Sequence, residues 1–423
     1  MCKQSKIKSI IFPAIIGNML EWYDFAFFGY FSLILGKLYF PAQSLFLSLL
    51  QAYGLVAASY LMRPIGAIFF GYLGDRISRN YSLKLSIVLM GMCSFLISML
   101  PIYADWGMTA SVCLTVIRLV QGMAVGGEYS GSAVLLIESA EDNKRTFFGS
   151  LALTSAYSGF LLSSLVGTLL SYFLSDLQLG TWGWRIGFAL GGLIAIIGFI
   201  IRSDMQPQET RRYFTVAPLT NLVTHHLKEF LLAIGVSILP AGFSYIVFVY
   251  ISNYLRFYSQ YSLHEILLFN TLNIAFSVLL IPIIGLISDK FGRKLMMFLS
   301  AWLILLFCIP LFGLLIHQAW TIMLLLSLLN AMFEANIPAE IAEMFPKDIR
   351  YTGVALTLNI TNGVAGGLAP LIASGLIQGT HLLVSPMFYV VGLAMVTIFC
   401  MHIKSAIYSR ETNHQQTLIN EFN

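Results

Sequence analysis

The sequence carries the stretch Gly-Leu-Ile-Ser-Asp-Lys-Phe-Gly-Arg-Lys at residues 285–294, where a long apolar segment gives way to a short charged loop. A related stretch, Gly-Tyr-Leu-Gly-Asp-Arg-Ile-Ser-Arg, occupies residues 71–79 and also follows an apolar segment. The aspartates of the two stretches, Asp75 and Asp289, are 214 residues apart. About half of the chain therefore separates two versions of one loop, which indicates an internal duplication.

The composition places this duplication in a membrane. Hydrophobic residues make up 58% of the 423 residues and charged residues only 10%, whereas soluble domains contain about 45–50% and about 25%, respectively. The net charge of +4 is dispersed along the chain and forms no basic patch that would suit a nucleic acid. We therefore expect a polytopic membrane protein, and the composition argues against a soluble enzyme, a nucleic-acid-binding protein and a disordered chain.

Apolar runs long enough to cross a bilayer, about 20 residues, recur twelve times. The expected spans are residues 9–36, 45–73, 84–103, 108–138, 147–173, 184–201, 229–256, 264–287, 295–317, 319–345, 351–378 and 384–405. We predict an all-α membrane protein with an N-terminal six-helix bundle (1–201), a cytoplasmic central loop (202–228), a C-terminal six-helix bundle (229–405) and a cytoplasmic tail (406–423).

Basic residues are distributed unequally between the two sides of the predicted membrane. If the N-terminus is cytoplasmic, 19 of the 24 lysines and arginines fall in cytoplasmic segments. Short cytoplasmic loops of membrane proteins carry such an excess. We therefore expect a multi-pass protein of the bacterial inner membrane with both termini in the cytoplasm.

A second charge pattern repeats at nearly the same spacing. Glu138 and Arg145 recur as Glu343 and Arg350, and both offsets are 205 residues. Two related halves of six membrane helices are the design of many secondary transporters, which bind substrate between the halves near the bilayer midplane.

The loop at residues 285–294 resembles the G-x-x-x-D-[RK]-x-G-R-[RK] motif of the major facilitator superfamily. The first copy departs from it, with Ser78 in place of glycine and Asn80 in place of the last base. Charges in such loops can hold the cytoplasmic side closed, and the alternative is that they only set the topology. The candidate gating charges of this kind are Asp75, Arg76, Arg79, Asp289, Lys290, Arg293 and Arg350.

Further stretches resemble one branch of that superfamily, the metabolite:proton symporters. They are Gly17-Asn-Met-Leu-Glu-Trp-Tyr-Asp-Phe25, Arg63-Pro-x-Gly66, Val125-Gly-Gly-Glu-Tyr129, Trp182-Gly-Trp-Arg-Ile186, Phe345-Pro-x-x-Ile-Arg-Tyr-Thr352 and Gly366-Gly-x-x-Pro370. The branch includes proline/betaine and α-ketoglutarate permeases. The resemblance implies twelve helices in two pseudo-symmetric bundles and proton-coupled uptake of a small metabolite, and it does not identify the substrate.

Charged side chains inside the predicted spans are the first candidates for a site, because each costs about 2.5–3.5 kcal/mol at a bilayer centre unless it has a partner or a wet cavity. Asn18, Glu21 and Asp24 share one face of span one. Arg118 and Gln121 lie in span four, in a stretch that resembles the superfamily's R-x-x-Q-G motif, which is associated with proton coupling. We expect Arg118 to face Glu21 and Asp24.

A second set of intramembrane charges is expected nearer the cytoplasm. It pairs Arg63 of span two with Glu128 of span four, as structural or gating charges. The alternative for both sets is that they are salt bridges that merely hold the N-terminal half together.

The C-terminal half has an acid, Glu334, near the middle of span ten. Burial disfavours an ionised carboxylate, which makes Glu334 a candidate proton carrier; the alternative is an acid hydrogen-bonded to Asn330 or Asn362 for packing. Aromatic residues form a candidate cage for a quaternary amine, with packing as the alternative: Tyr245, Tyr250 and Tyr254 in span seven, with Trp22 and Tyr157.

Four acids and two bases among these charges favour a zwitterion over an organic acid as the substrate. We predict a secondary active transporter that couples uptake of an amino acid or betaine-like solute to protons. The alternatives are a proton symporter for a di- or tricarboxylate or an α-ketoglutarate-like acid and, more remotely, a non-transporting membrane sensor. No nucleophile–base set, metal cluster or C-x-x-C spacing occurs, so we expect no enzyme activity, cofactor, metal or disulfide. The expected partners are substrate, protons and lipid, and we expect a monomer.

Overall fold

The computed structural model describes residues 18–19, 21–76, 79–125, 128–203 and 218–421, and for a minority of these only the backbone. Every regular element in this part of the chain is a helix. Those of the N-terminal half are residues 21–30, α2 (Ser32–Tyr39), α3 (Leu45–Leu61), α4 (Arg63–Arg76), α5 (Arg79–Met99), α6 (Tyr103–Trp106), α7 (Met108–Ala124), α8 (Glu128–Ser139), η1 (Asp142–Lys144), α9 (Arg145–Phe173), α10 (Asp176–Gln178), η2 (Leu179–Gly183) and α11 (Trp184–Ser203).

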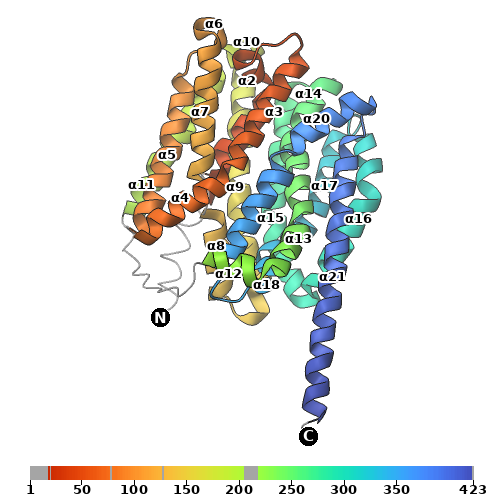
Figure 1. The fold of residues 1–423 in the computed structure, drawn as a ribbon. Coiled ribbons are helices and arrows are strands. Elements are labelled where there is room, and N and C mark those ends of the chain that lie inside the picture. The colour runs from red at the N-terminus through yellow and green to blue at the C-terminus, as the bar shows by residue number, and fades with distance from the viewer. Residues whose placement is uncertain (1–17, 20, 77–78, 126–127, 204–217, 422–423) are drawn as a thin grey trace.

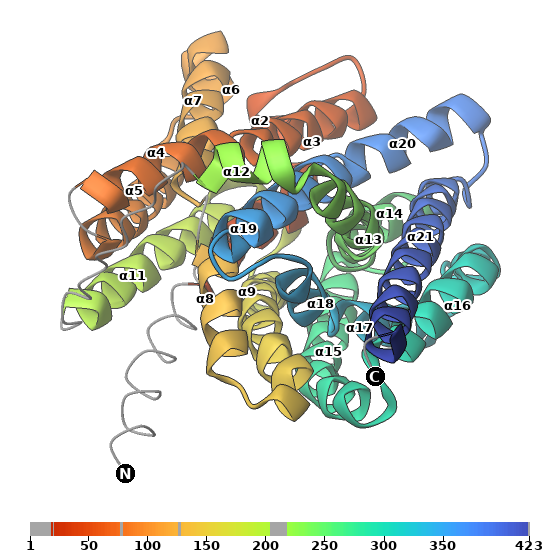
Figure 2. The same cartoon turned by 60° about the horizontal axis from the view of Figure 1, so that its bottom comes forward.

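The C-terminal half is also helical throughout its described residues. It contains α12 (Pro218–His225), α13 (Leu227–Tyr245), η3 (Ile246–Tyr250), α14 (Ile251–Tyr258), α15 (Leu263–Phe291), α16 (Arg293–Leu314), α17 (Ala319–Glu334), α18 (Ile337–Met344), α19 (Arg350–Thr361), η4 (Asn362–Gly366), α20 (Ala369–Thr380) and α21 (Pro386–Glu421). Figures 1 and 2 show the two halves meeting where α9 lies beside α15.

Ten helices of the described residues are long and apolar enough to cross a membrane. They match ten of the twelve predicted spans, for example Leu263–Phe291 against 264–287 and Ala319–Met344 against 319–345. Another predicted span, 84–103, corresponds to the shorter apolar helix Lys84–Met99. The remaining one, 9–36, begins outside the described residues. The predicted all-α membrane fold is therefore confirmed.

Several spans that the sequence predicted as continuous are broken near their middles. The break between α3 and α4 precedes Pro64, and α18 has a proline, Pro338, in its first turn; proline has no N–H to donate and clashes with the preceding turn. Two further spans contain π-helical turns, η3 and η4, a feature found often at functional sites. The helix breaks bring Arg63, Glu334 and Asn362 to helix ends.

The predicted cytoplasmic tail continues the last span. α21 runs without a break from Pro386 to Glu421, and Figure 1 shows its C-terminal end extending beyond the helix bundle. In the described end of the predicted central loop, the short helix α12 packs beside α13 and α19.

Candidate functional site: a cavity between the two halves

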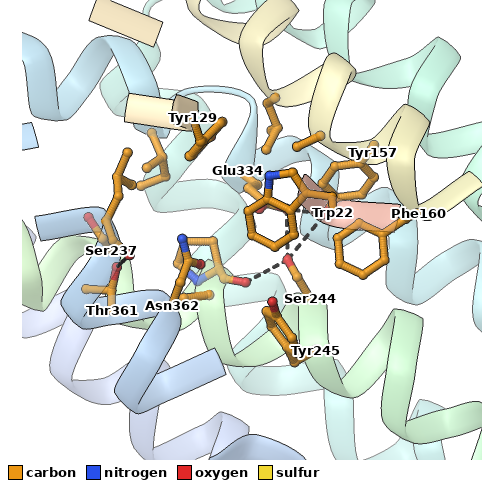
Figure 3. A pocket seen from close by; sticks show the side chains of 16 residues that line it. Trp22, Tyr129, Tyr157, Phe160, Ser237, Ser244, Tyr245, Glu334, Thr361 and Asn362 are labelled. Carbon is orange, nitrogen blue, oxygen red and sulfur yellow. Dashed lines mark hydrogen bonds between the residues drawn. The ribbon is translucent and has the colours of Figure 1, made fainter. Parts of the chain in front are cut away.

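A cavity lies where the two halves meet. Its N-terminal half contributes aromatic and small side chains: Trp22, Tyr129, Leu153, Ala156, Tyr157 and Phe160. Its C-terminal half contributes polar and small side chains: Ser237, Pro240, Ala241, Ser244, Tyr245, Glu334, Ile337, Leu358, Thr361 and Asn362. Both halves thus form its wall (Figure 3). This is the arrangement expected of a transporter that alternates access by moving one half against the other.

Glu334 ends α17 and supplies the one charged side chain of the cavity wall. Its Oε2 accepts hydrogen bonds from the Tyr157 hydroxyl, from Ser244 Oγ at 2.8 Å and from Asn330 Nδ2 at 2.7 Å. The other oxygen, Oε1, accepts no hydrogen bond from the described residues. The sequence analysis gave a packing role for Glu334, through a hydrogen bond to Asn330, as the alternative. That hydrogen bond is present, but it leaves Oε1 available to an occupant of the cavity.

Aromatic rings form much of the remaining wall. Trp22, Tyr157 and Tyr245, three members of the predicted cage, line the cavity. Trp22 lies 5.4 Å from Phe160 between ring centroids, and its Nε1 donates to Asn18 Oδ1 at 3.0 Å. The other two members of the predicted cage, Tyr250 and Tyr254, do not line it, and their inclusion was wrong. Tyr250 is the last residue of the π turn η3, and Tyr254 lies in the helix that follows it, so both lie beyond the residues that line the cavity.

Glu21 and Arg63 form an ion pair just behind this wall. Arg63 Nη1 lies 3.3 Å from Glu21 Oε1, and each side chain is only 2% exposed. The guanidinium also lies 5.2 Å from the centroid of the Trp22 ring, which lines the cavity. We grouped Glu21 with Arg118 and Arg63 with Glu128; instead Glu21 pairs with Arg63, while the side chain of Glu128 lies outside the described part of the structure.

Asp24 and Arg118 are joined through Gln121. Arg118 Nη1 donates to Gln121 Oε1 at 2.7 Å, and Gln121 Nε2 donates to Asp24 Oδ2 at 3.1 Å. The hydroxyl of Ser94 donates to the same carboxylate oxygen. All four side chains are buried. Sequence reasoning grouped Asp24, Arg118 and Gln121 correctly but missed Ser94, because a serine in an apolar span carries no signal of its own.

These contacts leave one partly buried charge, that of Glu334, without a counter-charge among the described side chains. Glu21 is balanced by Arg63, and Asp24 by Arg118 through the bridging amide. Among the described residues, no lysine or arginine forms an ion pair with Glu334 or lines the cavity wall. Since an uncompensated charge in a low-dielectric site is costly, the cavity is suited to a cation at Glu334.

A group of ion pairs joins the halves at the ends of α8, α9, α18 and α19. Glu138 of the N-terminal half accepts from Arg350 Nη1 at 3.2 Å, and Glu343 of the C-terminal half accepts from Arg145 Nη1 at 3.3 Å. These four residues are the repeat found in the sequence, and each half's acid pairs with the other half's base. Glu343 also pairs with Arg293.

Asp289 makes a different connection between the halves. Its carboxylate accepts the backbone N–H groups of Thr146 and Phe147 at 3.0 and 2.9 Å, in the first turn of α9. A carboxylate at a helix N-terminus satisfies donors that the helix cannot use and complements the helix dipole. Lys290 lies over the Phe291 ring. The side chains of Asp75, Arg76 and Arg79 lie outside the described part of the structure.

Replacing Asp289 with asparagine is expected to shift the protein toward states that are open to the cytoplasm. The amide keeps the shape of the side chain but loses the charge, and one of its two acceptor positions becomes a donor facing another donor. Distances between spin labels on residues 142 and 291 should lengthen or broaden. Lys290→Gln is the matched control, because Lys290 contacts only the neighbouring Phe291 among these groups; an unchanged distribution in Asp289→Asn would leave the loop with a role in topology alone.

Comparison with known proteins agrees with this geometry. The chain is 30% identical over 92% of its length to a proline/betaine transporter of Salmonella typhimurium, of which it covers 82%. The chain belongs to the major facilitator superfamily. The family profile of that name matches residues 230–415, and that of the sugar (and other) transporters matches residues 10–217. The relatives confirm the resemblance drawn from the motifs, and the chain is a multi-pass membrane transporter rather than an enzyme.

Other relatives and solved structures give the same result for the family and the fold. The chain is 28% identical over 96% of its length to a glycine betaine/proline/ectoine/pipecolic acid transporter of Dickeya dadantii, of which it covers 84%. The structure of a D-xylose–proton symporter superposes with a TM-score of 0.73 at 19% identity, over 93% of this chain and 96% of that one. An inward-open structure of a xylose transporter from E. coli gives 0.69 at 20% identity, over 92% and 95%.

Proposed function

We propose that the protein is a proton-coupled symporter that takes up a small zwitterion carrying an alkylated ammonium group, such as proline or glycine betaine. The observation that carries this proposal is the cavity itself, where the free oxygen of Glu334 stands among the rings of Trp22, Tyr157 and Tyr245. A cation over aromatic faces gains about 0.5–2 kcal/mol or more when it is desolvated. An alkylated ammonium suits such a wall, because it needs few hydrogen-bond acceptors.

The printed names of the relatives support the same class of substrate. Three of them, from Salmonella typhimurium, Escherichia coli and Dickeya dadantii, are named as transporters of proline and of betaine or glycine betaine. An organic-acid symporter is the alternative, but a cavity wall whose one charge is negative does not favour it.

Charge balance favours a proton-binding acid other than Glu334, which contacts the substrate. A zwitterion brings no net charge, so the cavity with its substrate keeps the negative charge of Glu334, and one proton on a buried acid neutralises it. If the substrate's ammonium occupies Glu334, Asp24 is the acid left to take the proton, held by Gln121 and Ser94. The R-x-x-Q-G stretch around Arg118 and the proton symport named for the xylose-transporting neighbour agree with this role.

The location follows from the same proposal. The relatives are bacterial, and the excess of lysine and arginine in alternate loops supports a topology with both termini in the cytoplasm. We propose a monomer in the inner membrane, because one chain already contains both halves of the cavity.

The test is uptake of radiolabelled glycine betaine and proline into proteoliposomes that contain the purified protein. An inward proton gradient should drive accumulation above the external concentration, and an uncoupler should abolish it. Unlabelled α-ketoglutarate at the same concentration should not compete. Uptake of α-ketoglutarate without uptake of either zwitterion would overturn the proposal in favour of the organic-acid alternative, and binding without any uptake would indicate a sensor.

A further inference from the structure

We propose that Asn362 and Tyr129 hold the anionic end of the substrate, and that Asn362 thereby determines the choice of a zwitterion over a simple cation. This inference rests on the proposed function, which assigns the cationic end to Glu334. The evidence is which polar side chains of the cavity wall already donate a hydrogen bond within the protein and which do not.

Most polar side chains of the cavity wall donate their hydrogen bonds to other groups of the protein. Trp22 Nε1 donates to Asn18, and the Tyr157 hydroxyl donates to Glu334. The hydroxyls of Tyr245 and Tyr60 share one hydrogen bond, in which either can be the donor. The Ser237 and Thr361 hydroxyls donate to carbonyl oxygens of their own helices, Ala233 at 2.6 Å and Thr357 at 2.9 Å. The single hydrogen of Ser244 is shared between Pro240 O at 2.7 Å and Glu334 Oε2 at 2.8 Å.

Two donors of the wall remain without a hydrogen-bond partner among the described residues. They are the side-chain amide of Asn362 and the hydroxyl of Tyr129, and both residues line the cavity (Figure 3). The Tyr129 ring is held edge-on against Trp22, 6.0 Å apart between centroids. The Asn362 side chain is half-buried, and neither donor is among the fully buried polar atoms that lack a partner. Both donors are therefore open to an occupant of the cavity, and a carboxylate is an acceptor that would satisfy both.

The backbone at Asn362 explains why its amide is available. Asn362 opens the π turn η4, and two glycines let this turn approach the opposite wall. A Cβ on Gly366 would lie 2.8 Å from the Tyr245 ring, and one on Gly367 would lie 2.8 Å from the Cβ of Tyr60. The Gly366-Gly367 pair noted in the sequence therefore permits the close packing that brings Asn362 to the cavity.

Neutral donors suit proton coupling better than a basic residue would. An arginine or lysine facing the carboxylate would cancel the charge of Glu334, and the cavity would then be neutral without a proton. An amide and a phenol bind the anionic end and leave the net negative charge in place. The wall thus recognises both ends of a zwitterion while it still requires a proton for neutrality.

Two probes that share a cationic end test this assignment. Glycine betaine and choline both carry a trimethylammonium group, but choline has a hydroxyl where betaine has a carboxylate. Binding of each to the full-length protein in nanodiscs is measured by isothermal titration calorimetry. The wild type should prefer betaine. Asn362→Ala and Tyr129→Phe should each weaken betaine binding about tenfold, as for loss of a hydrogen bond to a charged group, and leave choline binding unchanged.

Asn362→Asp gives an outcome that misfolding cannot imitate. The added carboxylate should weaken betaine binding further and strengthen choline binding, so that the two affinities move in opposite directions. Asn359→Ala is the matched control, since Asn359 lies in α19 of the same membrane span and outside the cavity wall, and its amide already donates to Ala355 at 2.9 Å. This variant should keep the wild-type ratio.

The inference is overturned if Asn362→Ala and Asn362→Asp keep the wild-type ratio of betaine to choline affinity. A wild type that binds neither probe would instead overturn the proposed function, so the two failures are distinguishable.

Discussion

Replacing Glu334 with glutamine is expected to abolish proton-driven accumulation and to weaken binding of glycine betaine about 10- to 100-fold. The variant keeps the shape of the side chain and can keep the donors of Tyr157, Ser244 and Asn330 on its carbonyl oxygen. What it loses is the single uncompensated charge of the cavity wall. Hydrogen bonds and contacts to a charged group are worth about 1.5–3 kcal/mol, which corresponds to that range of affinity.

The measurement combines calorimetric affinity with accumulation and with exchange at equal concentrations on both sides. Glu340→Gln is a suitable control, because Glu340 lies on the next helix, α18, bonds to Lys404 and does not line the cavity. Lost accumulation with unchanged affinity would assign the proton, not the substrate, to Glu334. Unchanged accumulation would make Glu334 a packing residue.

The sequence predicted the fold well because the fold depends on features that are local or periodic. A span is an apolar run of bilayer length, so the predicted bounds of the described spans agree with the structure within several residues. The repeat of Glu138 and Arg145 as Glu343 and Arg350 also carried information about contacts between the halves. A two-fold arrangement of the halves brings the acid of each copy next to the base of the other. The reciprocal ion pairs are the structural expression of that repeat.

The partners of span one were harder to predict. Asn18, Glu21 and Asp24 were placed on one helical face, but at about 100° per residue the first and last of them differ in direction by about 120°. In the structure they contact four different helices: Asn18 bonds to Ser155 on α9, Glu21 pairs with Arg63 on α4, and Asp24 bonds to side chains of α5 and α7. A spacing of three residues indicates neighbouring directions, not a common partner.

The cavity's remaining residues had no local signal. Ser244 and Tyr129 are ordinary residues of membrane helices, and only the packing of α8 and α13 around one space gives them a role. Glu334 was detectable because an acid in an apolar span is costly. Sequence reasoning therefore found Glu334 and the aromatic residues Trp22, Tyr157 and Tyr245, and it missed the serines and Tyr129.

Arg118→Ala and Asp24→Asn are expected to give the same phenotype, loss of accumulation with substrate exchange retained. Arg118 is fully buried, with Nη1 bonded to Gln121 and its guanidinium 4.3 Å from the centroid of Phe28. Without that charge, the buried carboxylate of Asp24 takes up a proton rather than remain ionised alone. Asp24→Asn is neutral at all times. At Asp24 both variants thus lack the negative charge, as the protonated carrier does, and such a carrier can exchange substrate but cannot use a proton gradient.

The double variant separates this mechanism from a general loss of structure. If the two residues act as one proton site, removing both should cost no more than removing either, because interacting residues are non-additive whereas independent sites add. Accumulation and exchange are compared in proteoliposomes for the two single variants, the double variant and Ser94→Ala, which keeps both charges and should retain accumulation. Accumulation by Arg118→Ala at the wild-type level, or loss of exchange in Asp24→Asn, would show that proton coupling does not pass through this pair.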